Sequence, residues 1–265
     1  MLQQRLATAA ILIAVFVLIF LFFPKWWLCV VAVGVIGLAS WEYYQMVLPK
    51  KGLGERLFYL LLGAIVPVAM CSGDLSSITG TLFISFFGIA SLYLLRISNL
   101  KEQFRDLACA LMGILYVSFL LSHLLLIRNM NGGKSWIFMI LIVTYIGDGA
   151  AYFVGSNLGK HRISPLLSPK KTVEGAIGGL LGAILAIYAC TYTFFAQING
   201  SQALWIALVL GISGQIGDMV ESLIKRSVDV KDSGNLLPGH GGILDRIDSI
   251  LFAGPMGYYI AQWMI

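Results

Sequence analysis

Nine long apolar stretches constrain this chain more than any other feature of its sequence. Each has about 20 residues with few charges, the length an α-helix needs to cross a hydrocarbon core roughly 30 Å thick. Of the 265 residues, 58% are hydrophobic and only 12% are charged, which leaves little for a soluble domain. The sequence therefore predicts an all-α polytopic membrane protein with about nine transmembrane helices, at residues 5–23, 27–47, 57–72, 78–96, 107–127, 136–159, 176–196, 203–226 and 249–265.

Lysine and arginine residues fall mainly on one side of this nine-span arrangement. Of the 18 such residues, only Lys25, Arg128 and Lys134 fall on the side opposite to the N-terminus. Because cytoplasmic loops carry an excess of Lys and Arg, we expect an inner-membrane protein with a cytoplasmic N-terminus and charged loops facing the cytoplasm. The same loops account for the net charge of +5, so a nucleic-acid partner is not expected. Basic loops beside a bilayer suit anionic lipid headgroups.

The chain shows no internal repeat or linker, so residues 1–265 are expected to form a single transmembrane domain. Polar residues within the spans crowd into its second half. We therefore expect residues 1–135 to form a helical scaffold and residues 136–265 to carry the catalytic helices and loops.

Several isolated residues in the apolar runs are interpreted as structural. His123 and Glu42 are each expected to be buried and hydrogen-bonded, or to lie at an interface. The four cysteines have spacings that match no metal site or disulfide framework, so we expect them to be buried and unbridged: Cys29, Cys71, Cys109 and Cys190.

Acidic residues within the predicted spans need compensation, because each costs about 2.5–3.5 kcal/mol on insertion scales. Asp218, Glu221, Ser222 and Lys225 fall within about 100° of one another on a helical wheel and make one polar face. Glu221 and Lys225 have the spacing of a helical ion pair. Asp218 has no basic neighbour close by on this face, so it must take up a proton or bind a cation. Asp148 lies between glycines and is expected to face the same polar interior.

Two further acids, Asp245 and Asp248, stand one turn apart near the start of the last predicted span. A helix start favours acidic side chains, so one of the two could serve only as a cap. If Asp245 and Asp218 come together, they form a site of hard oxygen ligands. Mg²⁺ prefers such ligands and recruits phosphate oxygens for the rest of its coordination shell.

Residues able to bind phosphate gather near these acids. "LPGHGG", residues 237–242, is a glycine-rich segment whose backbone amides can surround an anion, although such strings also form plain turns. "SPKKTVEG", residues 168–175, places two lysines before a helix, where they either bind an anion or simply flank a span. Thr172 is expected to cap that helix. The residues that could bind an anion here are Lys170, Lys171, Arg226, Lys231, His240, Gly241, Gly242 and Arg246.

This combination of acids, glycines and cations favours phosphoryl or nucleotidyl transfer. A metal ion and fixed cations can offset charge on the transferring phosphorus and on its leaving group. Since the predicted site is half in the bilayer, one substrate is expected to be a lipid phosphate or alcohol and the other a nucleotide. These residues alone do not distinguish CTP from another nucleotide.

The same motifs resemble those of the phosphatidate cytidylyltransferase (CDP-diacylglycerol synthase) family. "SPKKTVEG" resembles an upstream element of that family, and the sequence departs from the family at Val173, commonly Trp, and at Ser156, commonly basic. The C-terminal motif is matched at Ser222, Lys225, Arg226, Lys231, Asp232, Gly234, Leu237, Pro238, His240, Gly241, Gly242, Asp245, Arg246 and Asp248.

The resemblance implies a Mg²⁺-dependent nucleotidyltransferase of phospholipid biosynthesis, with its active site at the cytoplasmic face. CTP and phosphatidate would give CDP-diacylglycerol and pyrophosphate. Asp218 and Asp245 would hold the metal ion. Asp148 and Asp248 would bind a second cation or support the first. The basic residues, Lys225 among them, would hold the triphosphate. The other residues that would bind the nucleotide are Lys170, Lys171, Thr172, Ser222, Arg226, Lys231, His240, Gly241, Gly242 and Arg246.

Two other functions remain open, as does the question whether the chain forms a homodimer. A CTP-dependent lipid-alcohol kinase would attack the γ-phosphorus and release CDP. An ion-coupled transporter also carries carboxylates within the membrane. A transporter, however, predicts acids and glycine breaks in two related halves, whereas here they crowd after residue 147.

Overall fold

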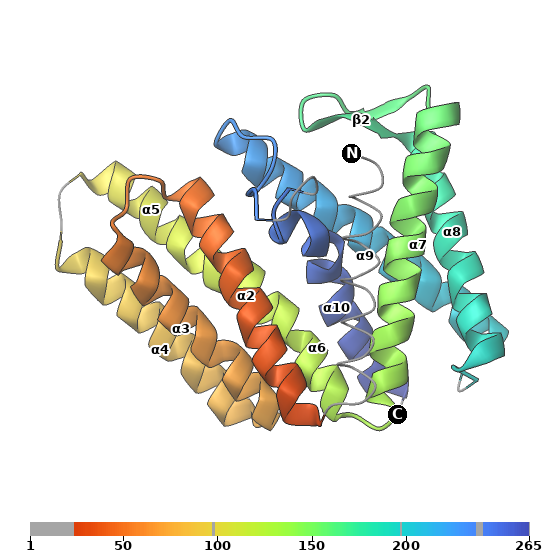
Figure 1. Cartoon of the computed structure of the whole chain (residues 1–265), viewed down its shortest axis with the longest axis horizontal. Coiled ribbons are helices and arrows are strands. Elements are labelled where there is room, and N and C mark those ends of the chain that lie inside the picture. Colours follow the sequence, from red (N-terminus) through yellow and green to blue (C-terminus); the bar gives the residue numbers. More distant parts are fainter. Residues whose placement is uncertain (1–23, 97–98, 197, 237–240, 265) are drawn as a thin grey trace. The chain divides into compact units, whose positions relative to one another are not determined.

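The computed structural model describes residues 24–96, 99–196, 198–236 and 241–264 (Figure 1). These residues are almost entirely helical, and their only strands form one small antiparallel hairpin. In chain order the elements are α2 (Lys25–Val47), α3 (Leu53–Ser72), α4 (Leu75–Leu94), α5 (Leu100–Gly113), the π-helix η1 (Ile114–Phe119), α6 (Leu120–Asn129), α7 (Gly133–Leu158), β1 (Arg162–Ser164), β2 (Ser168–Thr172), α8 (Val173–Thr193), α9 (Gly200–Ser227) and α10 (Leu244–Met264).

Seven helices in the described part of the chain are long and apolar enough to cross a membrane. They are α2, α3, α4, the continuous run of α5, η1 and α6, then α7, α8 and α9. The prediction of a helical membrane protein is confirmed, but the count of nine is not established. The predicted span 5–23 lies outside the described residues. α10 does not qualify, because polar residues such as Asp248 and Gln262 lower its mean hydropathy.

The hairpin of β1 and β2 departs from a purely helical structure. Arg162 pairs with Thr172, and Ser164 pairs with Ser168. The sequence did not indicate these strands, because they are short and the second contains Pro169, a residue that usually argues against a strand. β2 contains Lys170 and Lys171 and leads directly into α8. The hairpin therefore fixes the position of these two lysines relative to the start of α8.

The chain divides into two compact units. Among the described residues, the first unit combines those between 24 and 129 with those between 232 and 246, and the second combines those between 130 and 231 with those between 247 and 264. Each unit thus consists of two segments that are distant in sequence.

Buried tyrosines hold together the helices of the first unit. The hydroxyl of Tyr44 in α2 donates to the Ala110 carbonyl of α5 at 3.1 Å, and Tyr59 of α3 donates to Tyr93 of α4 at 2.9 Å. A buried hydroxyl needs a partner, so these bonds fix each helix relative to the next. His123 is 2% exposed, and its Nδ1 lies 3.0 Å from the Phe119 carbonyl, which confirms the predicted buried, hydrogen-bonded histidine.

A disulfide joins Cys29 of α2 to Cys71 of α3. The prediction that all four cysteines are unbridged was therefore wrong for this pair. The two residues are 42 positions apart in sequence, and only the antiparallel pairing of α2 with α3 brings them together. Cys109 and Cys190 are unbridged, as predicted, with Cys190 buried and Cys109 partly buried.

In the second unit, α7 and α8 pack closely through small residues (Figure 1). A β-carbon added at Gly178 would lie 2.6 Å from the Val154 side chain, and one added at Gly182 would lie 2.5 Å from the β-carbon of Ala150. Both distances are too short for van der Waals contact. The predicted stripe of glycines on α8 therefore serves helix packing.

Candidate active site

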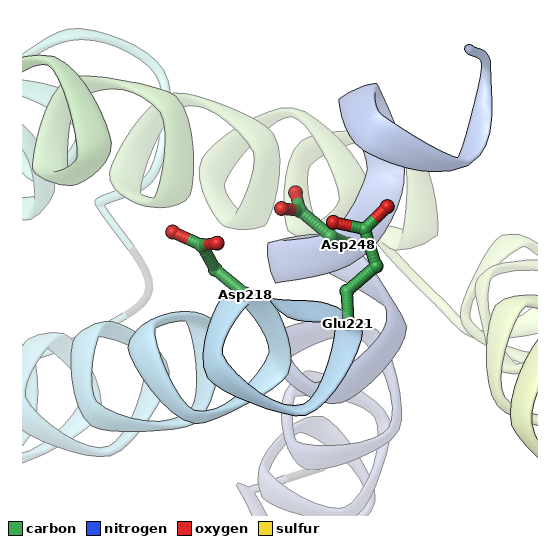
Figure 2. Close-up of side chains that lie close together, drawn as sticks. All are labelled: Asp218, Glu221 and Asp248. Atoms are coloured by element: carbon green, nitrogen blue, oxygen red, sulfur yellow. The ribbon is translucent and has the colours of Figure 1, made fainter. Parts of the chain in front are cut away.

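Three carboxylates of the second unit lie close together (Figure 2). Asp218 and Glu221 come from α9, and Asp248 comes from α10. One oxygen of each carboxylate lies within 4.8 Å of the others. We call these three residues the acidic cluster.

A glycine on α9 brings the two helices of the cluster together. A β-carbon at Gly217 would lie 2.5 Å from the Asp248 carbonyl oxygen and 3.3 Å from the Ser249 α-carbon. Only a residue without a side chain allows α10 to approach α9 so closely. The approach places Asp248 beside the carboxylate of the next residue on α9, Asp218.

Two lysines compensate the charge of the acidic cluster. The Nζ atom of Lys225 lies 2.5 Å from the Glu221 carboxylate, which confirms the predicted ion pair, and the Glu221 side chain is fully buried. The Nζ atom of Lys171 lies 2.6 Å from the Asp218 carboxylate. The inference that Asp218 lacks a counter-ion was wrong, because its partner comes from β2, far away in sequence.

Asp148 of α7 lies beside the acidic cluster. Its side chain hydrogen-bonds with that of Ser249, and it is close enough to Asp218 and Lys171 to interact with both electrostatically. It also lines a small cavity with Gln215 and glycines of α7, α8 and α9. The structure thus places Asp148 near Asp218, as the sequence predicts, while its role in cation binding stays a prediction.

The start of α8 has the cap that the sequence predicts. Thr172 is buried, and its Oγ1 accepts a hydrogen bond from the Gly175 amide at 3.1 Å. Glu174, in the first turn, accepts a hydrogen bond from the Lys160 amide at 3.0 Å, and its carboxylate lies 2.6 Å from His161 Nδ1. These bonds tie the hairpin to α8, so Lys171 is held at the cluster by a fixed element.

Three of the predicted basic residues, Arg226, Lys231 and Lys170, are exposed. Arg226 donates from Nε to the Leu167 carbonyl at 3.3 Å and from Nη1 to the Val230 carbonyl at 3.0 Å. The bond to Leu167 joins the end of α9 to the hairpin turn, and the bond to Val230 closes the loop that follows α9.

Asp245 belongs to the first unit, where its carboxylate is hydrogen-bonded to the backbone and a side chain of the preceding loop. Its Oδ2 atom accepts hydrogen bonds from the Ser233 amide at 2.9 Å, the Ser233 hydroxyl at 3.0 Å and the Gly242 amide at 2.8 Å. Gly241 has a φ of 79°, which favours glycine. Because Asp245 and Asp218 are in different units, the predicted metal site between them stays a prediction. His240 lies outside the described residues.

The donor set of the acidic cluster fits Mg²⁺. This ion takes oxygen ligands at about 2.0–2.1 Å in octahedral geometry, so its ligand oxygens are about 3 to 4 Å apart. One oxygen each of Asp218, Glu221 and Asp248 lies within 4.8 Å of the others, so a small movement of the side chains would bring them to that spacing. Waters and phosphate oxygens would complete the shell.

Comparison with known proteins shows where this chain belongs. The sequence model of the cytidylyltransferase family matches residues 3–264, nearly the whole chain. The chain is a member of the cytidylyltransferase family.

Similar members of the family come from several bacteria. A phosphatidate cytidylyltransferase of Thermotoga maritima is 33% identical over 98% of this chain and 96% of its own length. Those of Bacillus subtilis (strain 168) and Staphylococcus aureus (strain COL) are 43% and 39% identical over 59% and 60% of this chain. The match to the last two spans about three fifths of their own length.

In this cytidylyltransferase family member, sequence reasoning missed one member of the acidic cluster. Glu221 was interpreted as half of an ion pair with Lys225. It forms that pair and also turns toward Asp218 and Asp248 (Figure 2). The signal was present in the sequence, because Glu221 and Asp218 share one helical face.

Proposed function

We propose that the chain transfers the cytidylyl group of CTP to phosphatidate and releases pyrophosphate. Membership of the cytidylyltransferase family and the names of its relatives support this reaction. The observation that carries the proposal is the acidic cluster with a lysine at two of its three carboxylates. Such a set suits a metal-assisted reaction of a triphosphate.

In the proposed reaction, a phosphate oxygen of phosphatidate attacks the α-phosphorus of CTP. A new P–O bond forms there, and the bond from the α-phosphorus to the bridging oxygen breaks. Pyrophosphate leaves with the electron pair, and CDP-diacylglycerol remains. An ionised phosphate is already an adequate nucleophile, so the protein has to supply positioning and charge compensation rather than a strong base.

The acids would hold the divalent cation of this reaction. Asp218, Glu221 and Asp248 are the proposed ligands in the second unit. Asp245 is proposed as a further ligand, and Asp148 as a support for the cluster or a ligand of a second cation. When bound, Mg²⁺ would withdraw charge from the triphosphate and make its α-phosphorus easier to attack.

The basic residues would bind the triphosphate. Lys171 and Lys225 form ion pairs with carboxylates of the cluster, which supports the proposal that their ammonium groups would bind phosphate oxygens beside it. The N-terminus of α8 adds the positive end of the helix dipole, which favours an anion. The remaining proposed nucleotide contacts are Lys170, Thr172, Ser222, Arg226, Lys231, His240, Gly241, Gly242 and Arg246.

We further propose that the site faces the cytoplasm from the inner membrane, in a chain of nine spans. The excess of basic residues on one side supports this orientation. The disulfide supports it as well. In the nine-span layout Cys29 and Cys71 both fall on the side away from the cytoplasm, where disulfides persist. Helices before residue 136 would act as a scaffold for the catalytic part.

The identity of the released product tests the proposed function. Purified protein in detergent, given CTP and phosphatidate with Mg²⁺, is expected to release pyrophosphate and to form CDP-diacylglycerol, and to do neither when Mg²⁺ is chelated. Release of CDP with a lipid alcohol as acceptor would instead establish a kinase. Ion flux in proteoliposomes with no turnover of CTP would establish a transporter.

A further inference from the structure

Glu42 of α2 is a buried carboxylate that reaches across the first unit. It is 3% exposed and accepts three hydrogen bonds from the segment Asp232–Arg246. The Ile243 amide donates to its Oε1 at 3.0 Å, the Leu244 amide donates to its Oε2 at 2.9 Å, and the Ser233 hydroxyl donates to its Oε2 at 3.3 Å. All three donors are about 200 positions away in sequence.

The segment is shaped to admit this carboxylate. A β-carbon at Gly234 would lie 2.7 Å from Glu42 Oε1. A β-carbon at Gly242 would collide with the Ser233 hydroxyl and with Glu42 Oε2. Glycine at both positions lets the backbone close around the carboxylate, which indicates a built contact rather than a chance one.

The same hydroxyl connects Glu42 to Asp245. Ser233 Oγ lies 3.3 Å from Glu42 Oε2 and 3.0 Å from Asp245 Oδ2. A hydroxyl has one proton, so it donates to one of these carboxylates at a time. Asp245 also accepts a hydrogen bond from the Gly242 amide, which precedes the two amides that donate to Glu42. The two carboxylates therefore bind backbone amides of three consecutive residues, 242 to 244.

The charge of Glu42 is balanced mainly by this segment. Within the described part of the chain, no lysine or arginine forms an ion pair with it. Leu244 is the first residue of α10, so the Ile243 and Leu244 amides are among the unpaired N–H groups of a helix start, which favour a negative charge. A buried carboxylate without such donors is costly, so Glu42 favours the state in which the segment is in place.

We propose that Glu42 is a positioning residue that fixes the start of α10 and, through Ser233, the carboxylate of Asp245. The inference rests on the proposed function, in which Asp245 contributes to cation binding. In this proposal Glu42 acts through the backbone of α10 and not on the substrate. Its effect is to hold the backbone on which Asp245 stands, from a helix of the first unit that carries none of the proposed catalytic residues.

The test uses Glu42→Gln in the full-length protein. The amide keeps one oxygen for one backbone N–H and turns an NH₂ group toward the other, so the segment should loosen without a change in side-chain size. We expect the Mg²⁺ concentration for half-maximal turnover to rise about tenfold. The KM for phosphatidate should stay unchanged. Without Mg²⁺ or substrates, hydrogen exchange of peptides covering residues 241–244 should be faster than in the wild type.

The matched control is Tyr44→Phe, which removes another buried hydrogen bond two residues away on the same helix. It should lower the melting temperature and leave the Mg²⁺ requirement and the exchange of residues 241–244 unchanged. If Glu42→Gln does not fold, Ser233→Ala takes its place, with a smaller shift expected in the same direction.

Two results would overturn the inference: wild-type Mg²⁺ dependence and wild-type exchange in Glu42→Gln, or equal shifts in Glu42→Gln and Tyr44→Phe. Failure of the proposed function is a separate outcome, in which the wild type itself does not turn over CTP. The exchange measurement still decides whether Glu42 holds the segment in that case.

Discussion

Asp218 and Glu221 place two carboxylates on a helix that is otherwise apolar enough to cross a membrane. Lys171 and Lys225 offset their charge at 2.6 Å and 2.5 Å. An apolar pair of similar volume would generally be no less stable than such an ion pair. The charges are therefore consistent with the proposed role of holding a cation and a phosphate.

Replacement of Asp218 by Asn is expected to abolish turnover. The change removes one carboxylate of the acidic cluster, a proposed ligand of the cation, and leaves Lys171 without its carboxylate, so kcat should fall by about 100-fold or more. The melting temperature in detergent should show that the protein is still folded. Asp245→Asn should behave alike, and Glu102→Gln, at an exposed acid of α5, should keep wild-type activity. Robust turnover by Asp218→Asn would reject its role as a ligand.

Replacement of Lys225 by Ala is expected to weaken CTP binding. Loss of one charged hydrogen bond, about 1.5 kcal/mol, corresponds to an increase of about tenfold in the KM for CTP. Steady-state kinetics over a range of CTP concentrations measures this. Lys101→Ala, at an exposed lysine of α5, serves as the control. A variant with an unchanged CTP dependence would remove Lys225 from the nucleotide site.

At the scale of helices, the sequence predicts those features that depend on the local pattern of residues, which are the positions of the helices and their caps. Hydropathy alone indicates every helix from α2 to α9, and the capping residue Thr172 correctly marks the start of α8. The hairpin before α8 was not predicted, because its strands are too short to show a pattern. The hairpin places Lys171 against Asp218. This ion pair could not be predicted from the sequence, because the two residues are not on one helix.

The close contact of α7 with α8 predicts that two glycine-to-alanine substitutions differ in their effect on the free energy of unfolding. Gly182→Ala puts a methyl group 2.5 Å from the Ala150 β-carbon, so the free energy of unfolding should fall by about 1–3 kcal/mol. Gly149→Ala, on α7, meets nothing within 4 Å and should be neutral or slightly stabilising. Thermal unfolding in detergent compares the two, and equal melting temperatures would contradict the packing described here.

At the scale of the whole molecule, the features that could not be predicted from the sequence are contacts between segments that are distant in the chain. Cys29 and Cys71 are 42 positions apart, and Glu42 binds amides about 200 positions away. Neither pairing follows any local period. The motif residues themselves were recognisable, since they stand close together in the chain, but contacts such as that of Arg226 with Leu167 join them to segments that are distant in sequence.

The disulfide predicts a change in thiol count on reduction. Only Cys109 and Cys190 are free, so denatured but unreduced protein should take up two maleimide groups, and reduced protein four. Loss of the bond in Cys29→Ser should lower the free energy of unfolding by about 2–4 kcal/mol, because the bond restricts the unfolded chain. Turnover should persist. Uptake of four groups before reduction would show that the bond is absent.

Tracing the phosphorus atoms of CTP tests the central claim most directly. Wild-type protein in liposomes that contain phosphatidate is given CTP labelled either at the α-phosphorus or at the γ-phosphorus. Transfer of a cytidylyl group predicts that the α-label enters the lipid together with cytidine, while the γ-label leaves as pyrophosphate. Entry of the γ-label into the lipid, or no labelled lipid with either substrate, would contradict the proposed reaction.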